Sequence, residues 1–359
     1  MALPFLTEKG LQQASAEVVA RYRAACVGRR AQGALVLDAT CGIGADSCAL
    51  GLAGLRVVSA DREMENVELT RANRLHHGLD GAVVQADATA RAVEASLLLI
   101  DPDRRVGSGR SLDPARWSPT LGAALAAAAR TDGACLKLAP ALDPEVLIEA
   151  ESSHLHTDTP RRREWISRRG ELAELCLWTG ALAGENPEER QATRLDGDGG
   201  VHVLADRPEP VEAWCQEEAA RVAWIADPDP ALLRAGLLGN LARRMGLAPL
   251  APRIAYLGGE VRPETPFLRS WRVLGSAPLD PRQVRRLLAE HDIGPLEVHK
   301  RGHPDPPEVL ARRFRGKGGR RGRLLVTRLE RSHRAFLVES APESGLVGDE
   351  GLEPPTPSL

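Results

Sequence analysis

Five short apolar runs, separated by stretches with helical periodicity, constrain the fold of this chain more than any other feature. They lie at 34–37, 56–60, 82–85, 96–100 and 134–138. Strands that alternate with helices form parallel βαβ units, because a parallel strand pair needs a crossover connection. The pattern therefore predicts an α/β fold with a doubly wound parallel sheet, to which 201–205 is expected to add a last strand.

A glycine-containing turn follows the first of these runs. In VLDATCGIGADS, residues 36–47, Asp38 ends the strand, and Gly42 and Gly44 lie in the turn into the next helix. Glycine suits this place because a side chain would block the approach of a ligand to the backbone. A dinucleotide fold favours G-x-G-x-x-G, but Ser47 occupies the third glycine position. The spacing favours S-adenosylmethionine over a nicotinamide cofactor, and a purely structural turn is the alternative.

Two further carboxylates follow the next two strands. Asp61 ends the second strand in SADRE, seventeen residues beyond Gly44, where an acid can accept both ribose hydroxyls. Asp87 follows the third strand in QADAT, where a carboxylate can take the adenine amino group. Because successive parallel strands end at one edge of the sheet, Asp38, Asp61 and Asp87 are expected to converge on a crevice there. We therefore predict an S-adenosylmethionine site at this edge.

The fourth strand ends directly in DPDRR, residues 101–105. A carboxylate and a backbone carbonyl there could accept the two N–H bonds of an exocyclic amine and orient its lone pair for methyl transfer. Lys137, at the end of the fifth strand, could contact an anionic substrate. The alternative is that Asp101 only caps a turn and that Lys137 is only solvated. The candidate catalytic residues are Asp101, Pro102, Asp103 and Arg104.

The rest of the chain predicts a second, smaller α/β module after a proline-marked connector. Its expected elements are strands near 271–274 and 296–299, helices beginning at Asp280–Pro281 and near 307–314, and a hairpin of 324–328 with 335–338. A helix is expected in the connector at about 231–245. The expected divisions are an N-terminal helical segment at 1–34, a cofactor domain at 35–205, a helical connector at 206–249, a basic module at 250–340 and a disordered tail at 341–359.

Charge is distributed unevenly along the chain. Residues 282–334 contain fifteen arginines and lysines but six acids, an excess of nine positive charges in a chain whose net charge is −2. Arg320, Arg321 and Arg323 lie in RRFRGKGGRRGR, which we interpret as a flexible basic loop suited to phosphate contacts. A polyanionic partner is therefore expected. A merely solvated basic surface is the alternative.

Several classes of protein are not expected. The six cysteines form no CxxC pair, which favours free thiols in a reducing cytosol over disulfides or a zinc site. His154 and His156 have no acidic or cysteine cluster to complete a metal site, so no metal is predicted. The chain lacks both a run of about 18 apolar residues and the features of a signal peptide. We expect a cytoplasmic protein without a membrane span.

Several segments of the chain resemble a known family. DATCGIGAD, DREMENVELTRANRLHHG and DPDRR resemble segments of class I S-adenosylmethionine-dependent methyltransferases. FLTEKGLQQAS, EWISRRGELAELCLW and the segment from SWRVL through IGPLEVHKRG to LLVTR are similar to bacterial members with a C-terminal THUMP-like domain. The resemblance covers nearly the whole chain. It implies a Rossmann-like methyltransferase domain followed by a THUMP-like module, and RNA as partner, since THUMP domains are associated with RNA-modifying enzymes.

The DPDRR segment departs from the D/N-P-P-Y/F pattern of the methyltransferases that it resembles. Asp103 replaces the second proline and Arg104 replaces the stacking aromatic residue. Arg104 could instead stack on a base or bind phosphate, and the departure leaves methylation of a nucleobase amine open. The prediction is an S-adenosylmethionine-dependent methyltransferase acting on RNA, either transfer RNA or ribosomal RNA. The alternatives are a small-molecule or protein methyltransferase, and a non-catalytic RNA-binding protein that keeps the cofactor fold.

Overall fold

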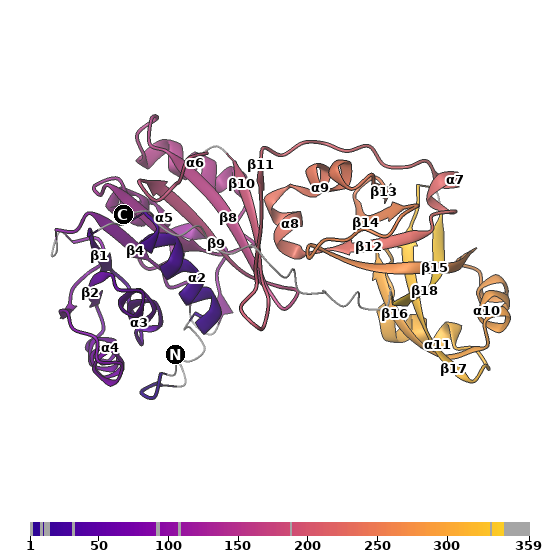
Figure 1. Cartoon of the computed structure of the whole chain (residues 1–359), viewed down its shortest axis with the longest axis horizontal. Coiled ribbons are helices and arrows are strands. Elements are labelled where there is room, and N and C mark those ends of the chain that lie inside the picture. Colours follow the sequence, from indigo (N-terminus) through magenta and orange to yellow (C-terminus); the bar gives the residue numbers. More distant parts are fainter. Residues whose placement is uncertain are drawn as a thin grey trace, which may run out of the picture. The chain divides into compact units, whose positions relative to one another are not determined.

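The computed structural model describes residues 3–7, 10, 15–30, 33–90, 94–106, 109–186, 189–330 and 332–340. The chain forms two compact units (Figure 1). The first contains Met1–Val211 and Pro228–Arg244, and the second contains Glu212–Asp227 and the chain from Met245 onward. The expected disordered tail at 341–359 lies outside the described residues, as do 1–2, 8–9, 11–14 and 31–32 of the expected N-terminal helical segment.

Five parallel strands form the half of the first sheet that carries the predicted cofactor residues. They are β1 (Leu35–Asp38), β2 (Arg56–Asp61), β3 (Val83–Gln85), β4 (Leu97–Ile100) and β7 (Gly133–Leu138). Their order is β3-β2-β1-β4-β7, and every neighbouring pair is parallel. The predicted doubly wound sheet is confirmed. The order changes direction at β1, and a ligand crevice is expected at such a point.

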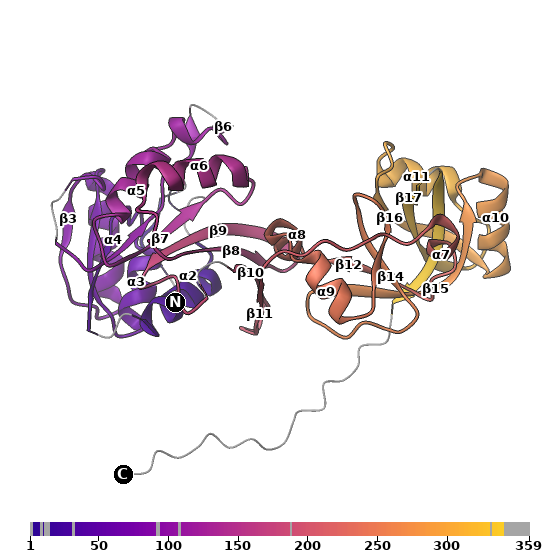
Figure 2. The same cartoon turned by 90° about the horizontal axis from the view of Figure 1, so that it is seen from above.

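Helices cover both faces of this sheet. They are α2 (Glu17–Gly28), α3 (Ala45–Leu52), α4 (Met64–His76), α5 (Leu121–Ala128) and α6 (Pro144–His154). Figure 2 shows α2 and α3 on one face and α5 and α6 on the other. The short elements β5 (Arg105–Val106), β6 (Gly109–Arg110) and η1 (Pro114–Arg116) lie between β4 and α5 in the sequence.

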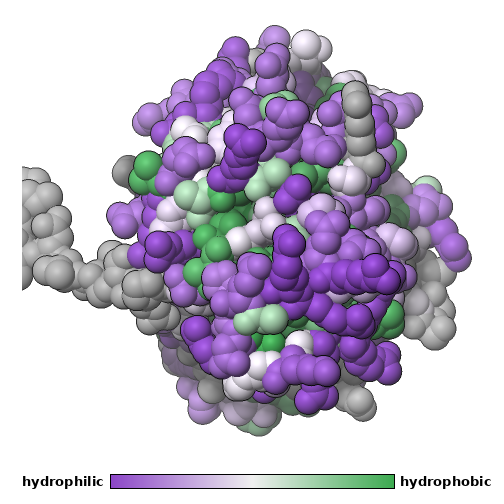
Figure 3. All heavy atoms as spheres, turned by 90° about the vertical axis from the view of Figure 1, so that its right-hand side faces the viewer, coloured by the Kyte–Doolittle hydropathy of each residue, from purple (hydrophilic) through white to green (hydrophobic). Residues whose placement is uncertain are grey.

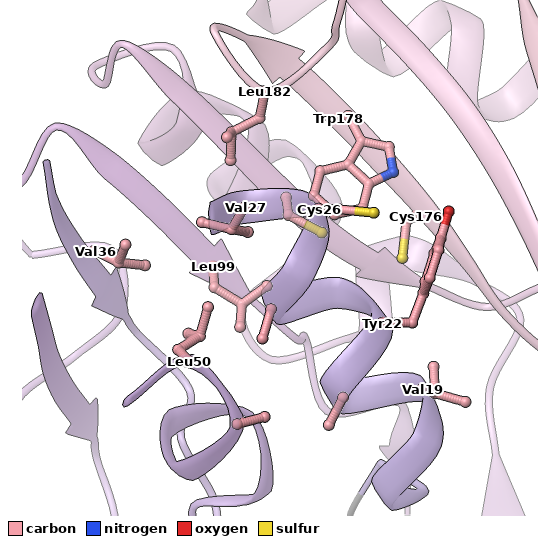
Figure 4. Packing of buried hydrophobic residues seen from close by; sticks show 14 of the residues in the cluster. Val19, Tyr22, Cys26, Val27, Val36, Leu50, Leu99, Cys176, Trp178 and Leu182 are labelled. Carbon is pink, nitrogen blue, oxygen red and sulfur yellow. The ribbon is translucent and has the colours of Figure 1, made fainter. Parts of the chain in front are cut away.

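The N-terminal helix α2 is part of the core of the first unit. Its residues Val19, Tyr22 and Cys26 pack in one cluster with Leu99 of β4 and Trp178, and all five are buried (Figure 4). Burying a large apolar side chain contributes about 1.5–3 kcal/mol. These contacts fix α2 against the sheet, so that the helix can hold its polar side chains in defined positions.

Four more strands extend the sheet beyond β7. They are β8 (Arg161–Arg168), β9 (Glu171–Gly180), β10 (Arg190–Leu195) and β11 (Val201–Asp206), in the order β11-β10-β8-β9-β7. The turn between β8 and β9 has positive φ angles at Arg169 (53°) and Gly170 (77°), as a tight hairpin requires. The residues of EWISRRGELAELCLW indicate a turn at Arg168–Gly170 but leave open whether a strand or a helix follows it, and the structure places a strand there. The last strand at 201–205 is also confirmed, whereas β10 was not predicted.

The predicted helix at 231–245 is two helices, so that prediction was wrong in its extent. Gly236 adopts a left-handed conformation (φ 75°) that ends α8 (Pro230–Ala235), and α9 (Leu238–Arg244) follows. Glycine ends helices in this way because it has no side chain to clash. The region expected as a helical connector also contains α7 (Gln216–Ala219) and a strand, β12 (Trp224–Pro228), that belongs to the second sheet.

The second unit is built on a seven-stranded sheet. Besides β12, its strands are β13 (Ala248–Ala251), β14 (Ile254–Gly259), β15 (Leu268–Pro278), β16 (Ile293–Arg301), β17 (Arg320–Arg328) and β18 (His333–Ser340), in the order β13-β14-β12-β15-β18-β17-β16. Its longer helices are α10 (Pro281–Glu290) and α11 (Pro307–Phe314). The smaller α/β module is confirmed, including the predicted hairpin, formed by β17 and β18. Asp280 caps α10 by accepting hydrogen bonds from the backbone N–H groups of Arg282 and Gln283.

The basic segment 312–323 is not one flexible loop. Its first residues end α11 and its last residues begin β17. Between them, the backbone of Gly318 donates a hydrogen bond to Ile293 O (3.1 Å), and a Cβ on Gly318 would lie 2.1 Å from the carbonyl carbon of Asp292. Glycine is needed there because two backbones pack in contact. The interpretation as flexibility was therefore wrong, although the segment is basic as expected.

Candidate active site

The loop from β1 to α3 uses its two glycines for different purposes. Gly42 has a φ of 54°, and a Cβ there would meet nothing within 4 Å, so its α-carbon faces open space. Gly44 has a φ of 89°, and a Cβ there would lie 3.1–3.2 Å from Thr70 of α4. Gly42 therefore leaves room on the cavity side of the loop, while Gly44 allows α3 and α4 to pack closely.

Asp61, at the end of β2, is buried and holds the glycine loop. Its Oδ2 accepts a hydrogen bond from the Gly42 backbone N–H at 3.0 Å. Its Oδ1 accepts hydrogen bonds from the Glu63 backbone N–H (3.0 Å) and Asn66 Nδ2 (3.1 Å). Asp61 and Gly42 line the same cavity, as the sequence predicted for a shared site.

Asp87 follows β3 and lines this cavity from an exposed position. Its Oδ1 accepts hydrogen bonds from the backbone N–H (2.7 Å) and the hydroxyl (2.5 Å) of Thr89. The bonds from the Thr89 hydroxyl and backbone stabilise the carboxylate and lower the pKa of Asp87. Asp87 therefore presents a fixed, ionised carboxylate to the cavity.

Asp38, like Gly44, does not line the cavity that Gly42, Asp61 and Asp87 share. Its side chain is buried under the loop, accepts a hydrogen bond of 2.5 Å from Ser47 Oγ, and is not among the residues that line the cavity. Burial and the nearby charge of Asp46 raise the pKa of Asp38 to about 7. The structure therefore brings Gly42, Asp61 and Asp87 together at the cavity and places Asp38 behind the loop.

Asp46, which sequence reasoning missed, lies on the cavity side in the first turn of α3. Arg23 of α2 donates to its Oδ1 through Nε (3.0 Å), and Lys137 Nζ donates to its Oδ2 (3.1 Å). Burial opposes ionisation of Asp46, but the charges of Arg23 and Lys137 outweigh it and hold its pKa well below its usual range. The sequence did offer one indication of a role for Asp46, since it is the only charged residue in α3, whose other residues are apolar or small.

Lys137 links Asp46 to the predicted catalytic loop. The residue is 8% exposed, and its ammonium donates a second hydrogen bond, of 2.5 Å, to Asp101 Oδ2. Burial alone would lower the pKa of Lys137, but the two carboxylates raise it above its usual value. The alternative of a merely solvated lysine is therefore wrong.

The DPDRR loop forms one wall of the cavity. Asp101, Pro102, Asp103 and Arg104 all line it, together with Ser118 and Pro119. The Thr40 hydroxyl accepts a hydrogen bond from the Asp101 backbone N–H at 2.6 Å. Asp103 exchanges two backbone hydrogen bonds with Ser118 (2.8 and 2.9 Å), which fixes the loop against the segment before α5. The four predicted catalytic residues thus share one cavity with Gly42, Asp61, Asp87 and Lys137.

The polar groups that line the cavity suit S-adenosylmethionine. The ribose hydroxyls and amino groups of this cofactor donate hydrogen bonds, and its sulfonium and ammonium groups carry positive charge. The lining offers the carboxylates of Asp46, Asp61, Glu63, Asp87, Asp101 and Asp103. The open space at Gly42 leaves room for such a ligand beside the backbone.

The three basic residues predicted to contact RNA lie on β17 in the second unit. Arg320 and Arg321 are exposed. Arg323 has an 18% exposed side chain that donates hydrogen bonds to Glu297 Oε2 (2.8 and 3.2 Å) and Ser340 Oγ (2.6 Å). Arg323 therefore joins three strands of the sheet, and Arg320 and Arg321 are the two that face solvent.

Among the described residues, no group of three or more His, Cys, Asp or Glu side chains is arranged to hold a metal ion. Five of the six cysteines are buried free thiols, and Cys215 is an exposed one. No helix in the described part of the chain is long and apolar enough to span a membrane.

Known proteins resemble this chain in sequence and in fold. Over 323 residues, the chain is 36% identical to an uncharacterized S-adenosylmethionine-dependent methyltransferase of Mycobacterium tuberculosis, found in two strains, and the match covers 90% of this chain and 84% of the relative. A crystal structure of a Porphyromonas gingivalis protein assigned as a methyltransferase superposes with a TM-score of 0.72 at 20% identity, covering 94% of this chain and 83% of that one. Residues 268–340 match the THUMP domain-like family. The predicted cofactor and family are thus confirmed: the chain belongs to the S-adenosylmethionine-dependent methyltransferases and has a C-terminal THUMP-like domain.

Proposed function

We propose that this methyltransferase acts on RNA, with transfer RNA or ribosomal RNA as the substrate class. The observation that carries the proposal is the exposed positive charge on α10, α11 and the start of β17. The THUMP-like match, which spans these elements, supports it. Phosphate backbones attract such surfaces because each contact releases counterions.

Positive charge gathers on the outer sides of two neighbouring helices. Buried residues of α10 and α11 share one core cluster, so both helices cover the same face of the second sheet. Arg282 and Arg285 on α10, Arg312 on α11, and Arg320 and Arg321 on β17 are exposed and form no ion pair with a described carboxylate. Figure 3 views the end of the unit that carries α10 and shows mainly hydrophilic residues there. These cations are available to a polyanion.

We place the acceptor nucleotide at the Asp101–Arg104 loop. S-adenosylmethionine, when bound, supplies a methyl group attached to a positively charged sulfur. Lys137 donates to Oδ2 of Asp101, and no described donor reaches Oδ1, which can accept an N–H of the acceptor amine. That bond would orient the nitrogen lone pair for in-line transfer. Arg104 and Arg105 line the same cavity and would favour the phosphate of the same nucleotide.

Methyl transfer to RNA from cells that lack this gene tests the proposal. The full-length enzyme is incubated with methyl-labelled S-adenosylmethionine and that RNA. We expect label in the RNA fraction and its disappearance after ribonuclease treatment. Mass spectrometry of the digested nucleosides then identifies the methylated base. Label that appears only in protein or in small molecules would overturn RNA as the substrate and favour the corresponding alternative.

A further inference from the structure

We propose that a groove between α2 and β11 in the first unit binds a phosphate group, supplied by the RNA strand. The groove has a volume of about 510 Å³ and shares no lining residue with the cofactor cavity. Its walls include Arg29, Arg30, Arg162, Val201 and Val203, and we call it the arginine groove. The RNA origin of the phosphate rests on the proposed function, whereas the anion site itself does not.

Arg162 is the residue that points most directly to an anion site. It lies on β8, is only 9% exposed, and lines the arginine groove. Its Nε is buried without a hydrogen-bond partner. A buried guanidinium is costly unless it is paired and its N–H groups are satisfied. A bound anion would remove this cost.

A second guanidinium lies beside that of Arg162. Arg30 Nη2 and Arg162 Nη1 lie 2.9 and 3.0 Å from the position that a Cβ on Gly184 would occupy, so the two groups are neighbours. Burial, and then the charge of Arg162, lowers the pKa of Arg30. Two cations held close together favour an anion that can bridge them.

The described residues supply no carboxylate to these arginines. Arg29 and Arg30 donate only to neutral atoms of Cys26, its Sγ at 3.1 Å and its carbonyl oxygen at 3.4 Å. Arg21, which also lines the groove, pairs instead with Glu17 at 2.9 Å. Arg29, Arg30 and Arg162 form no ion pair within the described ranges. They are therefore available to a ligand.

Glu164 is a nearby charge, but its oxygens are already used. They accept hydrogen bonds from Tyr22 (2.6 Å), Trp178 (2.7 Å), Gln191 (2.7 Å) and Thr193 (2.5 Å), all buried. Those donors are neutral, so Glu164 is satisfied inside the protein without the arginines. The groove keeps an excess of positive charge.

The shape and walls of the groove favour a nucleotide over a free phosphate. On its β11 side, Val201 and Val203 are 47% and 50% exposed. An apolar wall next to guanidiniums suits a ribose or base beside its phosphate, and guanidinium forks match phosphate oxygens in pairs. The volume also exceeds what one phosphate group would fill.

Titration of fluorescently labelled bulk transfer RNA at several salt concentrations tests the inference on the full-length protein. The variant carries Arg30→Gln and Arg162→Gln. Arg56→Gln is the matched control, since Arg56 is an exposed arginine of the same unit that lines neither cavity. We expect the double variant to bind RNA about tenfold more weakly, with a salt slope lower by about one for each phosphate that the variant no longer binds. The control should bind as the wild type does.

The melting temperature distinguishes a ligand-binding role of Arg30 and Arg162 from a structural role. Removing two neighbouring like charges should leave the melting temperature of the ligand-free double variant unchanged or higher, whereas a structural role predicts a fall. If the double variant does not fold, Arg29→Gln with Arg30→Gln provides the same RNA test at more exposed positions. Unchanged affinity for S-adenosylmethionine verifies that the cofactor cavity is intact.

The outcomes distinguish failure of this inference from failure of the proposed function. RNA binding that is equal in the wild type and the groove variant overturns the groove and leaves the RNA proposal in place. If the wild type binds no RNA, the RNA proposal fails, and thermal shifts with inorganic phosphate and adenosine monophosphate test the groove alone. A thermal shift that the wild type shows and the double variant lacks would support an anion site that binds free phosphate. Absence of a shift in the wild type would overturn the site.

Discussion

Lys137, at the end of β7, donates a hydrogen bond of 2.5 Å to Asp101, at the end of β4. The register of these parallel strands pairs Ile100 with Leu136, so the next residue of each strand lies side by side at the carboxyl edge of the sheet. Lys137 is buried and also binds Asp46, which in turn is held by Arg23 of α2. A chain of charged groups therefore runs from α2 to the candidate catalytic loop.

Lys137→Met should lower turnover at least tenfold while changing affinity for S-adenosylmethionine much less. The substitution removes a donor from Asp101 and Asp46, so it should also lower the free energy of unfolding by about 1–3 kcal/mol. Urea denaturation, calorimetry and initial rates measure the three effects. A double-mutant cycle with Asp101→Asn should show coupling between the two residues. Additive effects would mean that the hydrogen bond does not matter for turnover.

Asp101→Ala should reduce turnover about a hundredfold or more and leave cofactor affinity nearly intact. An interaction made mainly in the transition state lowers the rate without weakening ground-state binding. Asp113→Ala is the control, because Asp113 caps η1 and does not line the cavity. Methyl-transfer rates and calorimetry measure both quantities. A fully active Asp101→Ala enzyme would make DPDRR a structural turn.

Asp61→Ala should weaken S-adenosylmethionine binding by about 1.5–3 kcal/mol, as expected for hydrogen bonds to a charged group. It also releases the Gly42 backbone N–H that Asp61 holds. Asp87→Ala should cost less, because Asp87 is exposed and solvent competes with the ligand. Isothermal titration calorimetry on both variants tests this order. Equal affinities of Asp61→Ala and the wild type would remove Asp61 from the cofactor site.

The ionisation of Asp38 should lower the free energy of unfolding as pH rises. Its pKa is about 7 in the folded state, against an ordinary value of 3.8. Between these values the unfolded chain is ionised while the folded protein keeps the proton, so folding stability falls with pH through this window and levels off above about 7. The decrease is on the order of 4 kcal/mol.

Asp38→Asn should flatten that pH profile, because an amide does not ionise and can still accept the hydrogen bond from Ser47 Oγ. Urea midpoints measured from about pH 4 to pH 8 provide the test. If the profiles of Asp38→Asn and the wild type run parallel, Asp38 does not titrate in this window.

Arg320→Gln with Arg321→Gln should weaken binding of RNA similarly across sequences and lower the salt slope by about one for each phosphate that is no longer neutralised. Arg323→Gln is the comparison, because Arg323 is already bound to Glu297 and Ser340. It should change stability more than the salt slope. Filter-binding titrations at several salt concentrations measure the slopes. A slope in the Arg320/Arg321 variant equal to that of the wild type would exclude these two arginines as RNA contacts.

The parallel half of the first sheet could be predicted from the sequence because each of its strands and helices is marked by a pattern within its own residues. Apolar runs of strand length alternate with helices, and each is followed by its loop residues. Parallel strands end at one edge, so the placement of Asp61, Asp87 and Asp101 around a common cavity followed from strand order alone. Local sequence also indicated a turn at Arg168–Gly170, but it left open whether a strand or a helix follows, and the antiparallel pairing of β8 with β9 decides for a strand.

Tertiary structure decided which side of each element a carboxylate faces. Asp38 and Asp46 belong to the same glycine-loop motif, yet Asp38 lies buried against Ser47, and Asp46 lines the cavity. The sequence could not place Arg23 beside Asp46, because α2 packs on the sheet through apolar contacts distant in sequence. Likewise, the glycines around Gly318 indicate flexibility in the sequence, whereas in the fold Gly318 packs against the backbone of Asp292. The sequence determined the order of strands, loops and charges, whereas long-range packing decided which polar groups meet, since a side chain's partners depend on surfaces brought together only by folding.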